Sequence, residues 1–226
     1  MKSVIFDLDN TLYCERDYVM SGFKYVASYL STKYNLDETL IFNRMNTILE
    51  EHGRGSVFDL LLKEFDLYSP VNLHLCVYLY RSHKPDIKIY NSVLHVLHCL
   101  RELNLQLGII TDGRASVQKN KVTALKLEDY FDIIIYTDKL GEENWKPSLI
   151  PYQVALELLN TKPGEAVYIG DDPYKDFSAP KALGMMTIQY KCGVLESYWA
   201  DKGFKSTDAD FIVDDLMSII GIIEER

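Results

Sequence analysis

Near the start of the chain, the stretch Val4-Ile5-Phe6-Asp7-Leu8-Asp9-Asn10-Thr11 passes from a short apolar run directly into acidic and hydroxyl side chains. Two later segments repeat this change, at Leu107-Gly108-Ile109-Ile110-Thr111-Asp112-Gly113 and at Ala166-Val167-Tyr168-Ile169-Gly170-Asp171-Asp172. Continuous apolar runs of this length are typical of buried strands in a parallel sheet. Open α/β sheets bind their ligands beyond the carboxyl ends of such strands. We therefore expect the polar residues of all three segments to meet in one crevice.

Helix and strand patterns alternate over most of the chain. Such alternation is typical of a parallel sheet with helices on both faces, so the expected fold class is α/β, a doubly wound, Rossmann-like sheet. The expected strands cover residues 3–6, 105–110, 131–136, 166–169, 186–189 and 211–213. The expected helices between them cover residues 92–103, 115–125, 148–159 and 177–183, and a last helix follows the sixth strand.

The segment between the first two strands has only helical patterns. Apolar residues recur there at steps of three and four, which predicts helices from Asp17 onward and over residues 36–51, 57–65 and 71–82. Short connections favour a small antiparallel bundle. We therefore expect residues 14–86 to form a helical cap domain, inserted into a catalytic core made of residues 1–13 and 87–226.

Composition excludes several classes of protein. The 226 residues are 47% apolar and 25% charged, which is ordinary for a globular protein. The net charge of −9 argues against binding to nucleic acid or to an anionic membrane surface. There is no run of eighteen apolar residues and no signal-peptide pattern. The cysteines are scattered without a Cys-x-x-Cys pair, so free thiols in a reducing cytoplasm are expected at Cys14, Cys76, Cys99 and Cys192.

The polar residues at the strand ends suit one kind of chemistry. They provide several carboxylates and a hydroxyl, and Lys146 stands between the second and third segments. Carboxylate oxygens are ligands for Mg²⁺, and a carboxylate can also attack phosphorus as a nucleophile. The inventory therefore predicts a Mg²⁺-dependent reaction at a phosphate group.

Four motifs extend this interpretation to a family: Asp7-Leu8-Asp9-Asn10-Thr11, Thr111-Asp112-Gly113, Lys146-Pro147 and Gly170-Asp171-Asp172-Pro173-Tyr174-Lys175-Asp176. Their order and spacing resemble the haloacid dehalogenase superfamily, specifically its phosphatase branch with a helical cap after the first strand. Asp112 is a departure, because many relatives carry Asn there, but the backbone N–H at this position is expected to matter more than the side chain.

The resemblance implies a role for each acid of the first and fourth motifs. Asp7 would attack phosphorus and form an aspartyl-phosphate, although for Asp7 considered alone a helix N-cap would be the favoured explanation. Asp9 would protonate the leaving oxygen and then activate water, where the alternative is a solvated turn residue. The metal site would combine Asp7, Asp171 and, through its backbone carbonyl, Asp9. Asp172, Asp176 and Thr11 would orient these groups or the loop backbone.

The second and third motifs would bind the phosphate. Thr111 and the backbone N–H groups of Asp112 and Gly113 form an expected cradle at a helix start, where an ordinary helix cap would use the same groups. Lys146 would offset the charge of Asp7 and the incoming phosphate. Pro147 suits the first turn of a helix.

Substrate choice is expected to lie in the helical insertion. His52-Gly53-Arg54-Gly55 interrupts the helical pattern, and Arg54 would contact the leaving group or remain a solvated loop residue. The expected substrate is a small-molecule phosphate ester, and the expected protein is a cytoplasmic monomer or homodimer. Three alternatives stay open: a phosphomutase, a 2-haloacid dehalogenase, and a non-catalytic binding protein on the same core. The dehalogenases of this superfamily lack the acid at the position of Asp9.

Overall fold

The computed structural model describes residues 1–191 and 207–226, so Cys192 lies outside the described residues. The chain divides into two compact units. The sheet unit comprises Met1–Glu15 and Ile87–Arg226, and the helical unit comprises Arg16–Asp86. The sequence places the insertion at residues 14–86, which differs from the helical unit by two residues at its beginning. Cys14, Cys76 and Cys99 are free thiols.

The described part of the sheet unit contains a six-stranded parallel sheet in the order β3-β2-β1-β4-β5-β6. The predicted α/β fold with a parallel sheet is confirmed, and the observed strand ends differ from the expected ones by at most two residues. The strands are β1 (Ser3–Phe6), β2 (Gln106–Thr111), β3 (Ile133–Tyr136), β4 (Ala166–Gly170), β5 (Met186–Tyr190) and β6 (Phe211–Val213).

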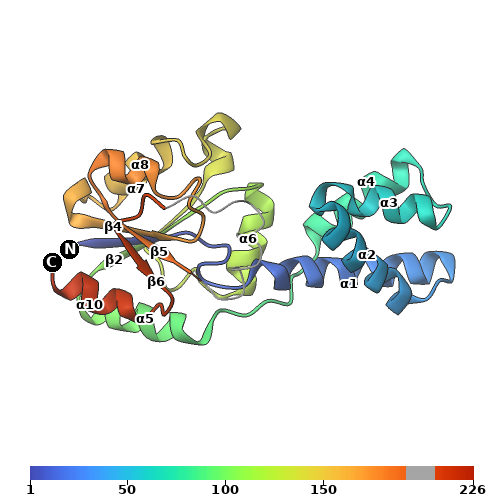
Figure 1. Ribbon diagram of the computed structural model, residues 1–226, viewed down its shortest axis with the longest axis horizontal. Helices are drawn as coiled ribbons and strands as arrows, with labels where there is room; N and C mark the ends of the chain where they lie inside the picture. Colours follow the sequence, from blue (N-terminus) through green and yellow to red (C-terminus); the bar gives the residue numbers. More distant parts are fainter. Residues whose placement is uncertain (192–206) are drawn as a thin grey trace. The chain divides into compact units, whose positions relative to one another are not determined.

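Helices cover both faces of this sheet. Figure 1 shows α7 and α8 on one side of the strands and α5 and α10 on the other. Helix α7 begins later than expected: Pro151, not Pro147, lies in its first turn, and the Lys146–Pro147 peptide bond precedes the helix. The helices are α5 (Asn91–Glu102), α6 (Ala115–Ala124), α7 (Ile150–Leu158), α8 (Ser178–Leu183) and α10 (Ser218–Glu224).

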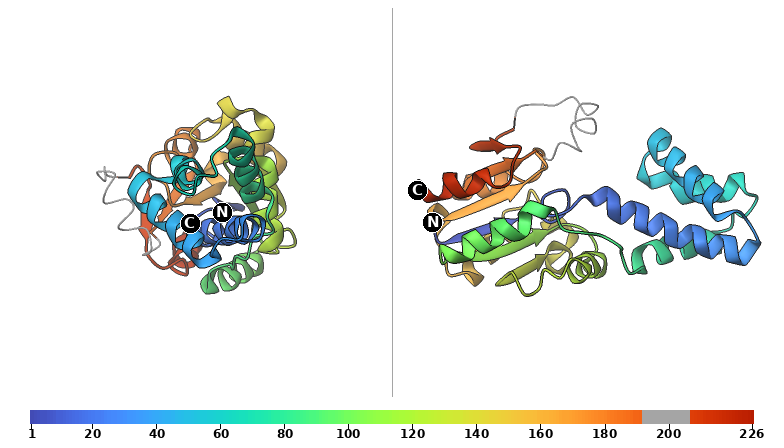
Figure 2. Two further views of the ribbon diagram at one scale, coloured as in Figure 1. Left: turned by 90° about the vertical axis from the view of Figure 1, so that its right-hand side faces the viewer. Right: turned by 90° about the horizontal axis from the view of Figure 1, so that it is seen from below.

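Strand β1 occupies the position that decides where a ligand can bind. All four of its residues are fully buried, because sheet neighbours flank it and helices cover both faces. Chain connections leave β1 toward β2 on one side and return to β4 on its other side, so the strand order reverses at β1. The N- and C-termini lie together at one end of this unit, and β1 begins there (Figures 1 and 2). The crevice of a doubly wound fold therefore lies beyond the carboxyl ends of β1 and β4.

The helical unit consists of four α-helices and one short 3₁₀ helix. Local signals set their ends: the Asp37 side chain accepts from Leu40 N–H at the start of α2, and Ser69 does the same for Asn72 at the start of α4. None of the described helices has the length and apolar character needed to span a membrane. The elements are α1 (Glu15–Tyr34), α2 (Glu38–His52), η1 (Arg54–Ser56), α3 (Val57–Glu64) and α4 (Pro70–Ser82).

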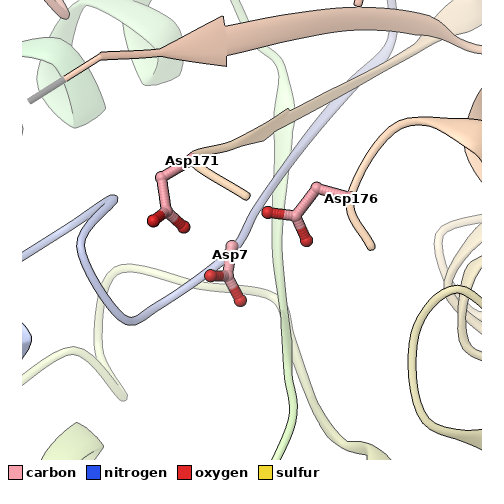
Figure 3. A group of neighbouring side chains, drawn as sticks. All are labelled: Asp7, Asp171 and Asp176. Carbon is pink, nitrogen blue, oxygen red and sulfur yellow. The ribbon is translucent and has the colours of Figure 1, made fainter. Parts of the chain in front are cut away.

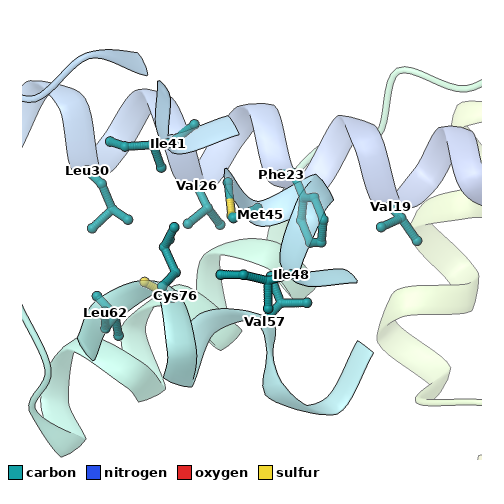
Figure 4. Packing of buried hydrophobic residues seen from close by; sticks show 12 residues of the cluster. Val19, Phe23, Val26, Leu30, Ile41, Met45, Ile48, Val57, Leu62 and Cys76 are labelled. Carbon is teal, nitrogen blue, oxygen red and sulfur yellow. The ribbon is translucent and has the colours of Figure 1, made fainter. Parts of the chain in front are cut away.

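Apolar packing holds these helices together. Figure 4 shows the core, to which every α-helix of the unit contributes, with Phe23 and Val26 from α1 facing Met45 and Ile48 from α2. Helices α1 and α4 approach closely at Gly22, where an added Cβ would lie 2.5 Å from the ring of Tyr80. The predicted bundle therefore has its own hydrophobic core.

Candidate active site

Three neighbouring strands deliver the polar residues of the sequence motifs to one place. Asp7 directly follows β1, Thr111 is the last residue of β2, and Asp171 directly follows β4. The register pairs Phe6 with both Ile109 and Ile169, so the three strands end at nearly the same level. The sheet thus brings together the three segments that the sequence analysis predicted to meet.

Three carboxylates form a compact buried group at this edge. One oxygen each from Asp7, Asp171 and Asp176 lies within 4.8 Å of the others, and all three residues are buried. Figure 3 shows the side chains of Asp7 and Asp171 side by side and that of Asp176 directed toward them. The sequence analysis assigned Asp176 only a supporting role, whereas its side chain lies in the same group as the two expected metal ligands.

Lys146 neutralises part of this negative charge. Its Nζ lies 2.6 Å from Asp7 Oδ1, 2.7 Å from Asp176 Oδ1 and 3.0 Å from the Tyr168 hydroxyl, and the side chain is fully buried. The second oxygen of Asp7, Oδ2, is buried and has no hydrogen-bond partner among the described residues. One oxygen of Asp7 is therefore held by an ammonium group, and the other remains available for another interaction.

Lys146 alone does not offset the charge of three carboxylates. Burial raises the pKa of Asp7 to about 7, since repulsion from Asp176 adds to desolvation while Lys146 and Lys175 oppose them. Burial and the charges of Asp176 and Asp7 also raise the pKa of Asp171 well above its ordinary value. Hard oxygen donors that repel one another, with one oxygen unpartnered, fit a divalent cation such as Mg²⁺. The donor set of this group is suited to a metal ion.

The loop after β4 fixes Asp176. Its Oδ2 accepts from the backbone N–H of Asp172 at 2.9 Å, and Oδ1 accepts from Lys146. Burial raises the pKa of Asp176, but the charges of Lys146 and Lys175 outweigh it, so the net shift is downward. An added Cβ on Gly170 would lie 2.5 Å from Asp176 Oδ2, so only glycine fits there without displacing the carboxylate. The side chain of Asp172 itself accepts from Tyr174 N–H, and the residue is half-buried.

Asp9 turns its carboxylate to different partners. Lys121 Nζ lies 2.7 Å and 3.0 Å from its two oxygens, Gln118 Nε2 donates to Oδ2 at 2.9 Å, and the Tyr13 hydroxyl donates to Oδ1. Burial raises the pKa of Asp9, but Lys121, Tyr13 and Gln118 together lower it to about 2. The carboxylate of Asp9 is therefore ionised and is not part of the three-acid group. Metal binding through its backbone carbonyl stays a prediction.

The second motif forms the start of α6. The Asp112 carboxylate accepts from the Thr137 hydroxyl at 2.8 Å and from the backbone N–H of Lys146 at 3.2 Å. It therefore ties the motif to the segment that carries Lys146. Gly113 has φ 112°, a conformation that glycine adopts without strain. The Asp112 side chain is thus used inside the fold, and phosphate binding by its backbone N–H stays a prediction.

Two further residues expected in the site are Thr11 and Arg54. Thr11 is buried, and its hydroxyl has no hydrogen-bond partner among the residues that the structure describes. Instead, the Asn10 side chain accepts from Glu15 N–H and so caps α1. Arg54 lies in the helical unit, at the start of η1, and is exposed. Its contact with a substrate stays a prediction.

Sequence reasoning missed the residues that hold Asp9. Gln118 and Lys121 lie three apart on α6, a helix with few apolar residues that reads as solvent-exposed, yet both side chains are buried. Tyr168 was seen only as part of an apolar strand, although its hydroxyl contacts Lys146 and Asp176. The spacing of Gln118 and Lys121 places them on one helical face, but only the opposing Asp9 reveals that this face is buried.

The chain matches a protein-family model and is similar in sequence to known proteins. A family model described as haloacid dehalogenase-like hydrolase matches residues 4–190. The chain is 28% identical to the glyceraldehyde 3-phosphate phosphatase of Methanocaldococcus jannaschii, over 99% of this chain and 97% of the relative. It is 26% identical to a putative pyrophosphatase PpaX of Caldanaerobacter subterraneus subsp. tengcongensis, over 98% and 94% of the two chains.

A solved structure agrees with these matches. The crystal structure of a HAD phosphatase from Thermococcus onnurineus is 26% identical in sequence, with a TM-score of 0.63. The similarity covers 99% of this chain and 98% of that one. The likeness therefore extends over both the sheet unit and the helical unit of the chain.

Proposed function

The chain belongs to the haloacid dehalogenase-like hydrolase family, and we propose that it is a phosphatase that hydrolyses a small-molecule phosphate monoester with Mg²⁺ as cofactor. The observation that carries the proposal is the environment of Asp7. One of its carboxylate oxygens is held by Lys146, and the other is buried without a partner beside Asp171. A nucleophile needs such an oxygen, directed into a site with enough positive charge to admit a phosphate dianion.

Asp7 carries the covalent chemistry in this proposal. Its Oδ2 attacks phosphorus while the bond from phosphorus to the leaving oxygen breaks, which produces an aspartyl-phosphate and an alcohol. Water then attacks the same phosphorus, and the bond to Asp7 breaks to release inorganic phosphate and restore the carboxylate. Lys146 stays beside Asp7 Oδ1 and balances the negative charge in both steps.

Asp9 moves the protons. It donates a proton to the leaving oxygen in the first step and accepts one from the attacking water in the second. Lys121, Tyr13 and Gln118 lower the pKa of Asp9 and so favour its ionised form, which is the form that accepts a proton. An anionic phosphate close by raises the proton affinity of a carboxylate, which favours protonation before the first step.

The remaining groups bind the phosphoryl oxygens and the cation. Thr111 and the backbone N–H groups at Asp112 and Gly113 cradle the phosphate at the start of the second motif. Asp7 and Asp171 would hold Mg²⁺, and Asp176 orients the group through Lys146 and the loop after β4. When bound, the ion supplies positive charge that screens the carboxylates from the phosphate.

The two units divide this work in our proposal. The sheet unit is the catalytic core, and the helical unit is the cap domain that selects the leaving group, with Arg54 as its candidate contact. We further propose that the protein acts in the cytoplasm as a monomer or homodimer.

A phosphate-release assay tests the activity. The compounds to compare are glyceraldehyde 3-phosphate and pyrophosphate, which the names of the relatives suggest, together with sugar phosphates, nucleotides and p-nitrophenyl phosphate. We expect release from at least one compound with Mg²⁺, loss of release with a chelator, and recovery when Mg²⁺ is restored. No release above that of Asp7→Asn from any compound would refute the proposal. Movement of phosphate between two hydroxyl groups without net release would identify a phosphomutase instead.

A further inference from the structure

Helix α6 buries polar groups where a surface helix normally buries apolar ones. Gln118 and Lys121 are only 2% and 3% exposed, and their neighbour on the helix surface, Lys119, is exposed. Burying an ammonium group costs free energy unless a carboxylate pairs with it. Lys121 has that partner in Asp9, which lies 112 positions earlier in the chain.

The bonds on Asp9 use its full acceptor capacity. An ionised carboxylate offers about four lone-pair positions, two on each oxygen. In Asp9 these accept from Tyr13 and Lys121 at Oδ1, and from Gln118 and Lys121 at Oδ2. The side chain is therefore held in one orientation by groups on two separate segments of the chain.

The side-chain amide of Gln118 also contacts Thr111, a residue of the proposed phosphate cradle. Gln118 Nε2 lies 2.5 Å from Thr111 Oγ1 as well as 2.9 Å from Asp9 Oδ2. A side-chain amide has two N–H groups, so it can donate to both acceptors at once. With an acceptor position of Thr111 filled, the hydroxyl hydrogen is left to donate to a phosphoryl oxygen.

We propose that Gln118 and Lys121 are positioning residues, which hold the Asp9 carboxylate and the Thr111 hydroxyl in one hydrogen-bonded unit at fixed places in the site. The inference rests on the proposed phosphatase function and adds two residues on α6 to it. Lys121 and Gln118 act through Asp9 and Thr111 and need no contact with substrate.

One bond on Asp9 must be exchanged during turnover, since a water molecule or a leaving oxygen needs a lone pair of this carboxylate. The neutral Tyr13 hydroxyl is the partner whose replacement costs least. Lys121 contributes a charge-assisted pair of bonds, and Gln118 is held at its other N–H by Thr111. Lys121 and Gln118 therefore keep the carboxylate in place while the position used by Tyr13 exchanges.

A double-mutant cycle with Asp9 tests this assignment. Lys121→Met and Gln118→Leu are made in the wild type and in Asp9→Asn, and nitrophenolate release from p-nitrophenyl phosphate is followed with Mg²⁺ at high enzyme concentration, where a single turnover is visible. We expect each substitution to lower kcat of the wild type roughly 10²-fold, as misplacement of a catalytic group does, and to change KM less than threefold. In the Asp9→Asn background Lys121→Met should not lower the rate further, because the carboxylate it positions is already lost, and Gln118→Leu should lower it less than in the wild type, because only its bond to Thr111 remains to be removed.

Two matched variants separate positioning from folding. Lys121→Arg keeps the charge and should recover at least part of the lost kcat, and Lys119→Met changes an exposed lysine of the same helix and should match wild type. If Lys121→Met fails to fold, as judged by its thermal transition, Gln118→Leu and Lys121→Arg carry the test.

Two outcomes would overturn the inference while leaving the phosphatase proposal intact. They are a kcat within threefold of wild type in both single variants, and losses of equal size with and without the Asp9 carboxylate. An inactive wild type would instead refute the proposed function on which the inference rests.

Discussion

The sheet unit and the helical unit bury different kinds of side chain. Among the described residues, every buried charged side chain belongs to the sheet unit, namely Asp7, Lys121, Lys146, Asp171 and Asp176. In the described core of the helical unit, His83 is the buried polar residue, and the rest of the core is apolar. Its imidazole contacts the Tyr80 carbonyl through Nδ1, and burial lowers its pKa.

This difference indicates what each unit is built to do. Apolar burial stabilises a fold at about 25 cal/mol per Å², whereas buried charges contribute little stability and become costly when one partner is lost. The sheet unit keeps several buried charges beside one another, an arrangement that stability alone does not favour. Substitutions in the two units are therefore expected to affect different properties, activity in the first and stability in the second.

The largest effect is expected at Asp7. Asp7→Asn should lower kcat for p-nitrophenyl phosphate by at least ~10³, as removal of a covalent nucleophile does. Its thermal midpoint without metal should be unchanged or higher, since the amide removes one of three mutually repelling carboxylates. Steady-state kinetics and thermal unfolding measure both quantities. Asp66→Asn, an exposed position in the helical unit, is the control. Parallel loss of activity and stability in Asp7→Asn would contradict the distinction between the units.

Substitution of Lys146 should be an exception, because it should lower both activity and stability. Lys146→Met leaves Asp7 and Asp176 buried without their cation, and breaking a buried pair costs about 3–5 kcal/mol. Denaturant unfolding and kcat measured on the folded protein check the two losses. The control is Lys139→Met at an exposed site. A Lys146→Met protein as stable as wild type would mean that these ion pairs do not contribute to the stability of the fold.

The core of the helical unit should respond through stability alone. Ile48→Ala removes a fully buried side chain and should lower the unfolding free energy of this unit by about 2–5 kcal/mol. Hydrogen exchange resolves the effect by unit, with amides of α1 to α4 losing protection and those of β1, β2 and β4 keeping theirs. Leu40→Ala, exposed on the same helix, should change protection little. Equal loss of protection in both units would show that they unfold together.

The smallest effect is expected at Arg54, where a substitution in the helical unit should change substrate binding. Arg54→Ala should raise KM for the physiological substrate by the equivalent of about 1.5–3 kcal/mol, the worth of a hydrogen bond to a charged group. The KM for p-nitrophenyl phosphate should change much less. Arg81→Ala, another exposed arginine of this unit, is the control. Equal effects on both substrates would remove Arg54 from leaving-group recognition.

Much of the fold was predictable because its signals are local. The apolar runs of β1, β2 and β4 identified buried parallel strands, and the strand ends identified Asp7, Thr111 and Asp171. Turn chemistry was harder to predict: the 3₁₀ segments Thr137–Leu140 and Glu142–Asn144 lack a periodic pattern, and Pro147 was placed in a helix that begins at Ile150.

The parts of the site that escaped prediction depend on long-range contacts. The pairing of Lys121 with Asp9 joins residues 112 positions apart, and nothing in the composition of α6 shows that its polar face is buried. The placement of Asp176 beside Asp7 depends on how the loop after β4 folds back on Gly170. A single sequence carries the identity of such residues but not their partners.

The covalent role of Asp7 is tested most directly by trapping its product in Asp9→Asn. A substrate with a good leaving group needs little acid assistance, so p-nitrophenyl phosphate should still phosphorylate Asp7 slowly, while the following hydrolysis lacks its base. Acid quench and mass spectrometry of this variant, incubated with Mg²⁺, should show one added phosphoryl group, located on the peptide that contains Asp7 and absent when Asp7→Asn is added. Turnover of Asp9→Asn at the wild-type rate, or a phosphoryl group on a different residue, would contradict the mechanism.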